Sequence, residues 1–144
     1  MNATSFDPKA AYALVRPPLD KVVWKELMLN NKATPKARFC LWMALRGRLA
    51  TKDRMIRFDS SIDPTCSLCN QEPEDINHLL FCCAETGSMW RRLLSWYGLS
   101  CTAQTWEEVV CFACRNAKGK SPRKRIFKAV FTEFVHALWI ERNR

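Results

Sequence analysis

The chain has 144 residues, and its 48% hydrophobic and 26% charged residues are the balance of one soluble globular domain, which excludes a largely disordered protein. Lysine and arginine outnumber aspartate and glutamate by 23 to 14, a formal net charge of +9. A charge of this size favours polyanions, of which nucleic acid is the usual one. A basic surface with no specific partner is the alternative.

The sequence carries no sign of export or of membrane insertion. Residues 1–12 contain no apolar signal core, and the longest apolar run, Phe39 to Leu45, is too short to span a bilayer. We therefore expect a protein of the nucleus or cytoplasm without a membrane partner. Thiols stay reduced in these compartments, so the eight cysteines are expected to be metal ligands or buried thiols rather than disulfides.

In the first half of the chain, start and stop signals predict four helices. Asp7-Pro8 and Thr34-Pro35 each pair a capping side chain with a proline suited to the first helical turn. Gly47 supplies a stop, and Thr51 caps a short segment. The expected helices cover residues 10–15, about 21–29, the segment between Pro35 and Gly47, and 51 to about 57.

The second half repeats the same signals. Ser88 to Tyr97 reads as a helix that Gly98 ends, and Thr105 with Glu108 forms a capping-box pattern that opens a helix to about Asn116. Ser121-Pro122 starts the last and longest helix, whose apolar stripe comprises Phe127, Val130, Phe131, Phe134 and Leu138. The prediction is a mainly α, compact helical domain over 1–144, with N-terminal helices in 7–57, a zinc knuckle at 63–84 and C-terminal helices in 88–143.

Five residues between the two helical halves include four with the spacing of a zinc site. Cys66 and Cys69 are separated by two residues, His78 follows, and a cysteine pair ends the segment. Zinc takes thiolate and imidazole ligands in a tetrahedron. Cys82 shares the face of His78 if the helix continues, whereas Cys83 does so only if the helix ends or tightens first. The alternatives are buried thiols with a core histidine, and an open catalytic zinc with three protein ligands; the number of thiolates favours a closed structural site.

The remaining cysteines and histidine point to packing rather than chemistry. Cys111 and Cys114 lie within an expected helix, with only His136 and Cys101 as spare ligands, so we predict core thiols there. Cys40 is predicted in the core. Glu74 and Asp75 read as helix-start carboxylates that favour the helix dipole. With no phosphate-binding glycine loop and no carboxylate cluster, we predict no enzymatic activity and no small-molecule substrate.

At these residues the chain resembles a known family. The segments that carry the resemblance are residues 10–14 (AAYAL), 23–27 (VWKEL), 35–36, 39–42 (FCLW), 47–54 (GRLATKDR), 66–69 (CSLC), 77–83 (NHLLFCC), Trp90 and 139–143 (WIERN). Together they resemble the zinc-binding domain downstream of the reverse transcriptase in plant non-LTR retrotransposons. The resemblance implies Cys83, five positions after His78, as the fourth ligand, and a cysteine at position 82 departs from the family pattern. It also implies an RNA- or DNA-binding module that helps the polymerase engage its template or target.

Two basic stretches are candidate phosphate contacts. The first runs from Lys32 to Arg57 and the second from Arg115 to Lys128, onto a helix N-terminus that also favours anions. The contacts predicted are Lys36, Arg38, Arg46, Arg48, Lys52 and Arg54 in the first stretch, and Lys118, Lys120, Arg123, Lys124, Arg125 and Lys128 in the second. We expect non-specific binding to phosphates. The rival hypothesis is a domesticated protein–protein interaction module with a structural zinc.

Overall fold

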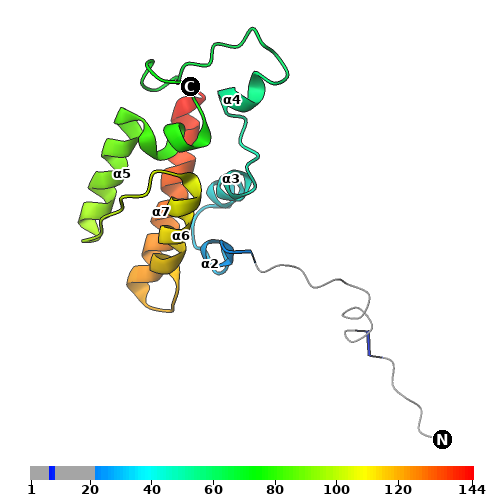
Figure 1. Ribbon diagram of the computed structural model, residues 1–144. Helices are drawn as coiled ribbons and strands as arrows, with labels where there is room; N and C mark the ends of the chain where they lie inside the picture. The colour runs from blue at the N-terminus through cyan, green and yellow to red at the C-terminus, as the bar shows by residue number, and fades with distance from the viewer. Residues whose placement is uncertain (1–6, 9–21) are drawn as a thin grey trace, which may run out of the picture.

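The structure is a computed structural model that describes residues 7–8 and 22–144. Helices account for the regular structure of these residues, which contain no β-strand, and Figure 1 shows their arrangement. The helix expected over residues 10–15 lies outside the described residues. The elements are α2 (Lys25–Met28), α3 (Pro35–Leu45), α4 (Lys52–Met55), the π-helix η1 (His78–Cys82), α5 (Ala84–Trp96), α6 (Trp106–Ala117) and α7 (Pro122–Arg142). The mainly helical class that the sequence predicts is confirmed.

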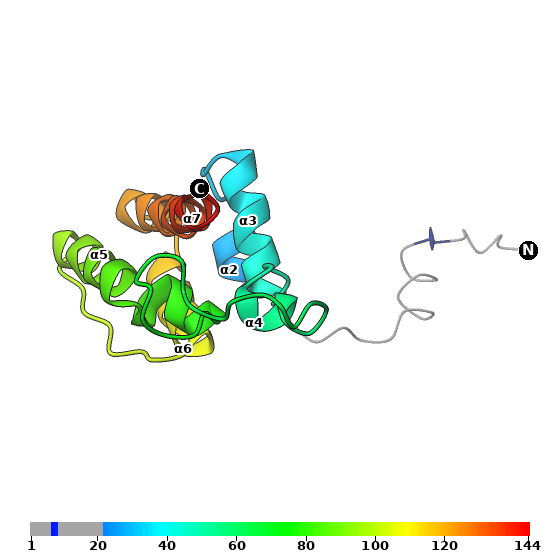
Figure 2. The same cartoon turned by 90° about the horizontal axis from the view of Figure 1, so that it is seen from above.

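Helix α7 is the element around which the others pack. The Ser121 hydroxyl accepts the Lys124 N–H at its start, and Pro122 occupies the first turn, as the sequence predicts. Its buried face carries Phe127, Phe131 and other apolar side chains. Helices α3 and α6 pack directly on it. Viewed obliquely along α7, α3 lies to its right, α5 to its lower left and α6 below it (Figure 2).

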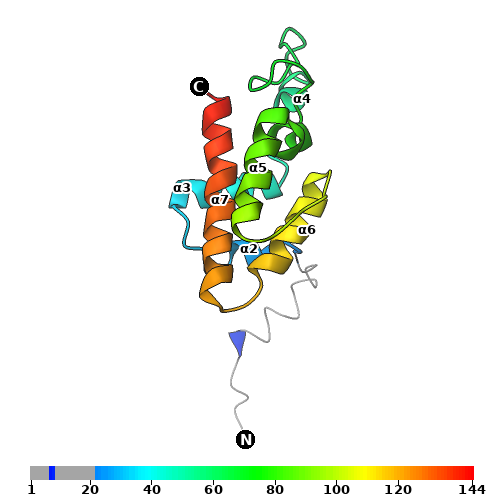
Figure 3. The ribbon, with the colours of Figure 1, turned by 90° about the vertical axis from the view of Figure 1, so that its left-hand side faces the viewer.

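An aromatic cluster joins the cysteine region to the helices. Phe81 of η1 contacts Trp90 of α5, Trp106 of α6 and Phe134 of α7, with ring centroids 5.2, 5.8 and 6.4 Å away, respectively. Trp90 also lies edge-on to Phe131 at 5.7 Å. Large rings in such contacts contribute both apolar burial and favourable edge interactions. The short η1 turn is thereby fixed against three helices at once, and Figure 3 shows α5 and α7 running side by side along this core.

Two helix starts differ from those expected. Helix α5 begins at Ala84, four residues before Ser88, because Cys83 has an extended backbone and its carbonyl accepts the Gly87 N–H at 2.8 Å. Gly87 is buried, and a Cβ atom there would lie 2.6 Å from the Phe81 carbonyl oxygen. The glycine in the first turns of α5 is therefore a close-packing residue. Helix α2 is also shorter than expected, since only Lys25–Met28 is helical among the described residues 22–29.

Helix α3 is less central than its apolar sequence suggests. Its Thr34 cap accepts the Ala37 N–H, Cys40 is buried as expected, and Leu41 is buried too. Phe39, however, is 63% exposed. Helix α3 packs mainly against one neighbour, α7, so part of its surface, Phe39 included, remains open to solvent.

Candidate metal centre

The structure brings Cys66, Cys69, His78 and Cys83 together. One ligand atom from each residue lies within 4.8 Å of all the others, and Cys69 Sγ is 3.3 Å from His78 Nε2. Zinc–sulfur bonds of about 2.3 Å and zinc–nitrogen bonds of about 2.0 Å place tetrahedral ligand atoms about 3.5–3.8 Å apart, about 1 Å inside this limit. The group is therefore positioned to bind a metal with little rearrangement.

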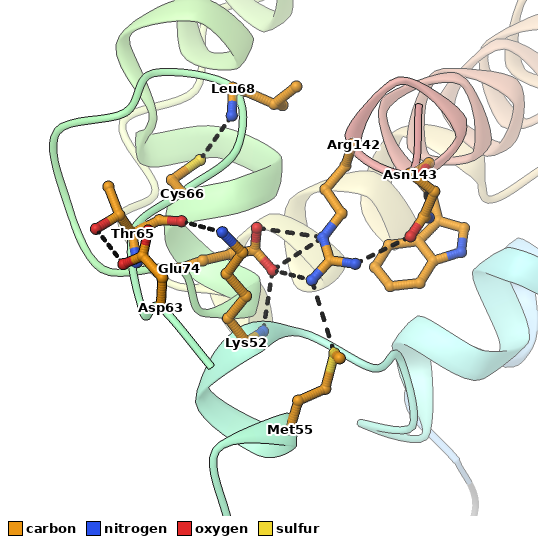
Figure 4. A network of polar contacts seen from close by, with 10 residues as sticks. Lys52, Met55, Asp63, Thr65, Cys66, Leu68, Glu74, Arg142 and Asn143 are labelled. Carbon is orange, nitrogen blue, oxygen red and sulfur yellow. Dashed lines mark hydrogen bonds and ion pairs between the residues drawn. The ribbon is translucent and has the colours of Figure 1, made fainter. Parts of the chain in front are cut away.

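A tight turn presents the first two ligands. The Cys66 carbonyl accepts the Asn70 N–H at 2.9 Å, and Asn70 takes the left-handed φ of 54° that asparagine tolerates. The Leu68 N–H points to the sulfur of Cys66 at 3.5 Å, as Figure 4 shows. Before the turn, the Asp63 carboxylate accepts the Thr65 N–H at 3.0 Å. The turn is fixed by local hydrogen bonds at both ends.

The other two ligands come from the π-helical turn. The Cys83 N–H donates to the His78 carbonyl at 2.8 Å, so the ring closes over five residues instead of four. This wider turn places the residue five positions after His78 beside it. Sequence reasoning required the helix to end or tighten for Cys83 to reach the site, and the helical turn both widens and ends at Cys82, with Cys83 as its non-helical cap. The Asp75 carboxylate accepts the His78 N–H at 2.7 Å and fixes the start of the turn.

Cys82 lies outside the group. Its side chain is exposed, and its thiol donates to the Gln104 carbonyl at 3.3 Å. The argument that favours Cys82 assumes a regular α-helix after His78. Because η1 is a π-helix, Cys82 faces away from the other ligands and Cys83 takes the position near them.

The pKa values of the two cysteines of the turn shift in opposite directions: hydrogen bonds lower that of Cys69, and burial raises that of Cys66. The backbone N–H of Glu72, with help from Gln71, His78 and Cys83, lowers the pKa of Cys69 to about 6 despite some desolvation. Burial raises the pKa of Cys66 above its ordinary value. Thiolates are the form that binds metal, and a bound cation stabilises them. Three sulfurs and one imidazole are a donor set that suits zinc.

Sequence reasoning missed a buried ion pair next to the site. Glu74 is fully buried, and its carboxylate receives Arg142 Nη2 at 2.7 Å and Nε at 3.0 Å, together with the Lys52 N–H at 3.0 Å (Figure 4). The expectation that Glu74 serves a helix dipole is wrong, because Glu74 lies before the helical turn and faces the end of α7. No local spacing could signal a partner 68 positions away.

The remaining cysteines and histidine form no second site. Cys40 and Cys114 are buried, as predicted. The prediction of Cys111 as a core thiol is wrong, because Cys111 is exposed on the solvent side of α6. His136 is half-buried, with Nδ1 3.9 Å from a Glu133 oxygen. In the part of the chain that the structure describes, no other cluster of three or more histidine, cysteine or carboxylate ligands is present.

Most of the predicted phosphate contacts lie at the surface. The exposed ones are Lys36, Arg38, Arg46, Arg48, Lys118, Lys120, Arg123, Lys124 and Arg125. Arg54 is half-buried, and so is Lys52, whose ammonium donates to the Thr65 carbonyl. Lys128 is 7% exposed and donates to the Leu29 carbonyl at 2.7 Å, so its prediction as a surface contact is wrong. It lines a cavity of about 570 Å³ with Lys32, Lys120 and Arg125, where the two basic stretches meet.

None of the helices in the described ranges, 7–8 and 22–144, is long and apolar enough to cross a membrane. A family model described as zinc-binding in reverse transcriptase matches residues 6–90, more than half of the chain. The match includes all four grouped ligands and ends at Trp90, before α6 and α7. No curated protein and no solved structure matches the chain.

Proposed function

This chain belongs to the family of zinc-binding domains in reverse transcriptase, and we propose that it is a non-catalytic domain that holds one structural zinc and binds RNA or DNA. Cys66, Cys69, His78 and Cys83 would hold the ion. We further propose an origin in a plant non-LTR retrotransposon polyprotein, and a place of action in the nucleus or cytoplasm, where the thiols stay reduced.

A structural role for the zinc follows from the ligand set. Four protein ligands fill the tetrahedron and leave no position for a water or a substrate, which catalytic zinc sites keep open. A zinc ion bound in this way contributes folding free energy, on the order of 10 kcal/mol in other structural sites. Here it would stabilise the turn at Cys66 and the π-helical turn relative to each other, next to the aromatic cluster around Phe81.

The observation that carries nucleic-acid binding is the large set of exposed cations without acidic partners. Among the described residues the ion pairs within 4.0 Å involve only His136, Arg142 and Arg144, and none of these belongs to the predicted contacts. Cations that are free of carboxylates remain available to phosphates. Lys32, Lys120 and Arg125 border one cavity, which Glu26 also lines, so the two basic stretches meet there with cations in excess over carboxylates.

Salt-dependent binding to random RNA and DNA tests this function. Binding through phosphates predicts an association constant that falls steeply with salt. For each phosphate contact, the constant should fall by close to tenfold for every tenfold rise in salt concentration. The pair Lys124→Glu and Arg125→Glu should flatten that slope by about 1 to 2 units. Arg123 is left unchanged in this test because its guanidinium donates to the Tyr97 carbonyl and helps join α7 to α5.

The matched control is the pair Arg91→Glu and Arg92→Glu on α5. Both side chains are exposed and lie outside the two basic stretches, and the net charge changes by the same amount. If both double variants flatten the salt dependence equally, the effect comes from net charge and not from the two basic stretches. No binding at low salt would contradict the proposal and favour a protein-interaction module, for which Phe58 and Trp96, 91% and 82% exposed, are candidate contacts.

A further inference from the structure

Helices α3 and α7 border a groove whose residues the zinc site does not use. It has a volume of about 360 Å³. Lys36, Phe39, Cys40 and Met43 of α3 line it at the three- and four-residue steps of one helix face, opposite His136 and Trp139 of α7. No carboxylate is among the described residues that line it. The groove is therefore a mainly apolar and aromatic depression with cations at its edge.

Phe39 carries the most exposed ring among the residues that line the groove. Its ring stacks on Trp42, with centroids 5.9 Å apart and planes 27° apart, yet 63% of the residue remains exposed. The contact with Trp42 restricts a ring that is largely open to solvent, and an aromatic ring of this kind can offer its π face to a ligand. Trp139 adds a second ring, which the Arg142 guanidinium covers at 5.2 Å.

The charges around the groove suit a phosphate chain. Lys36 precedes Phe39 by one helical turn, and Arg48 borders the groove from the segment after α3. Neither side chain has a carboxylate oxygen within 4.0 Å among residues 7–8 and 22–144. Burial raises the pKa of Cys40 to about 11, so the thiol on the groove stays uncharged at neutral pH and adds no negative charge.

We propose that this groove takes an unpaired nucleobase, which stacks on Phe39 while Lys36 and Arg48 contact the adjoining phosphates. The inference rests on the proposed nucleic-acid binding and specifies its substrate as a single strand. Aromatic side chains beside a cationic track are how proteins bind single strands without sequence preference. Bases in a duplex are stacked and paired, so they cannot enter the groove.

Three oligonucleotides of equal length separate base stacking from phosphate binding in this chain: a single strand, the same strand as a duplex, and a strand that is abasic throughout. All carry the phosphates, but only the first offers unpaired bases. We expect the tightest binding for the single strand. Phe39→Ala should weaken that binding roughly 5-fold or more, the equivalent of about 1 kcal/mol or more per stacked base, and leave binding to the abasic strand unchanged.

Substitutions at exposed positions provide the controls. Phe39→Tyr keeps a ring and should keep the affinity, whereas Phe39→Leu keeps only apolar bulk and should behave like Phe39→Ala. Phe58→Ala removes another exposed ring, 91% accessible and outside the groove, and should change nothing. A melting curve for each variant checks that the fold is retained.

The outcomes distinguish the two levels of the proposal. Equal affinity for the single strand and the abasic strand, or unaltered binding by Phe39→Ala, would overturn the groove assignment and leave the phosphate-binding function standing. An equal loss from Phe58→Ala, or full affinity in Phe39→Leu, would also overturn it. Failure of all three oligonucleotides to bind at low salt would remove the proposed function itself.

Discussion

The carboxylate of Glu74 lies 2.7 Å from the guanidinium of Arg142, and the two side chains are 0% and 10% exposed. Glu74 sits between the cysteine turn and the π-helical turn, and Arg142 ends α7. The Asp53 N–H also donates to the Glu74 carbonyl at 3.1 Å, and the Glu74 N–H donates to the Pro64 carbonyl at 2.8 Å. This pair connects α4, the metal centre and the end of the longest helix.

Glu74→Gln tests the contribution of that pair. The substitution leaves the Arg142 charge buried without its counter-ion, and breaking a buried pair in this way destabilises by about 3–5 kcal/mol. Urea denaturation of the zinc-loaded protein measures the loss. The control is Glu141→Gln, which breaks an exposed pair with Arg144 and should change the free energy of unfolding by no more than about 1 kcal/mol. Similar values for both variants would contradict the role given to Glu74.

Cys83→Ser and Cys82→Ser separate the two candidate fourth ligands. Only Cys83 lies with the other ligand atoms, because the π-helical turn carries Cys82 away from them. We expect Cys83→Ser to lower zinc affinity steeply and Cys82→Ser to leave it near that of the unmodified chain. Competition with a chromophoric chelator measures both affinities. The reverse order would show that the turn after His78 is a regular α-helix in solution.

Gly87→Ala should destabilise the protein although the position is helical. In an ordinary helix interior, alanine is favoured over glycine by about 1 kcal/mol. Here the new methyl group would lie 2.6 Å from the Phe81 carbonyl oxygen, and overpacking of this kind destabilises by about 1–3 kcal/mol. Denaturant unfolding measures the change. Ser88→Ala, at the next and exposed position of α5, should be neutral or slightly stabilising; a stabilised Gly87→Ala would refute the close approach.

Cysteines outside the metal group should react with an alkylating reagent at different rates. Burial raises the pKa of Cys40 and of Cys114 to about 11, so both remain protonated near pH 8, and the thiolate is the reactive form. Cys111 is exposed and should react first. Mass spectrometry of peptides from briefly alkylated native protein measures the order, and the same treatment in denaturant should remove the difference. Equal labelling of Cys40 and Cys111 in the native protein would contradict the burial.

The features that the sequence predicted well are those determined by nearby residues. The Thr105 hydroxyl accepts the Glu108 N–H, and the Glu108 carboxylate accepts the Thr105 N–H, as the capping-box pattern requires. Thr34 and Ser121 also cap the helices expected of them. Likewise, the spacing of cysteines and histidine identified Cys66, Cys69 and His78, which the structure groups, but it left Cys82 and Cys83 as alternatives for the fourth member.

The features that escaped prediction depend on contacts between distant segments. Lys128 looks like one more cation of a basic stretch, but helix α7 turns it toward the Leu29 carbonyl, 99 positions away. Glu74 finds its partner at the end of the chain. The π-helical turn at His78 has no local sequence signal, and only its packing through Phe81 and the bond from Cys83 reveal it.

Thermal unfolding with and without a strong chelator, on protein whose zinc content is measured in the same sample, tests the central claim most directly. If Cys66, Cys69, His78 and Cys83 hold a structural zinc, the sample contains one zinc per chain. Removal of that zinc lowers the melting temperature steeply, and its return restores the melting temperature. A melting temperature that does not change in excess chelator, after the zinc has left, would contradict the claim.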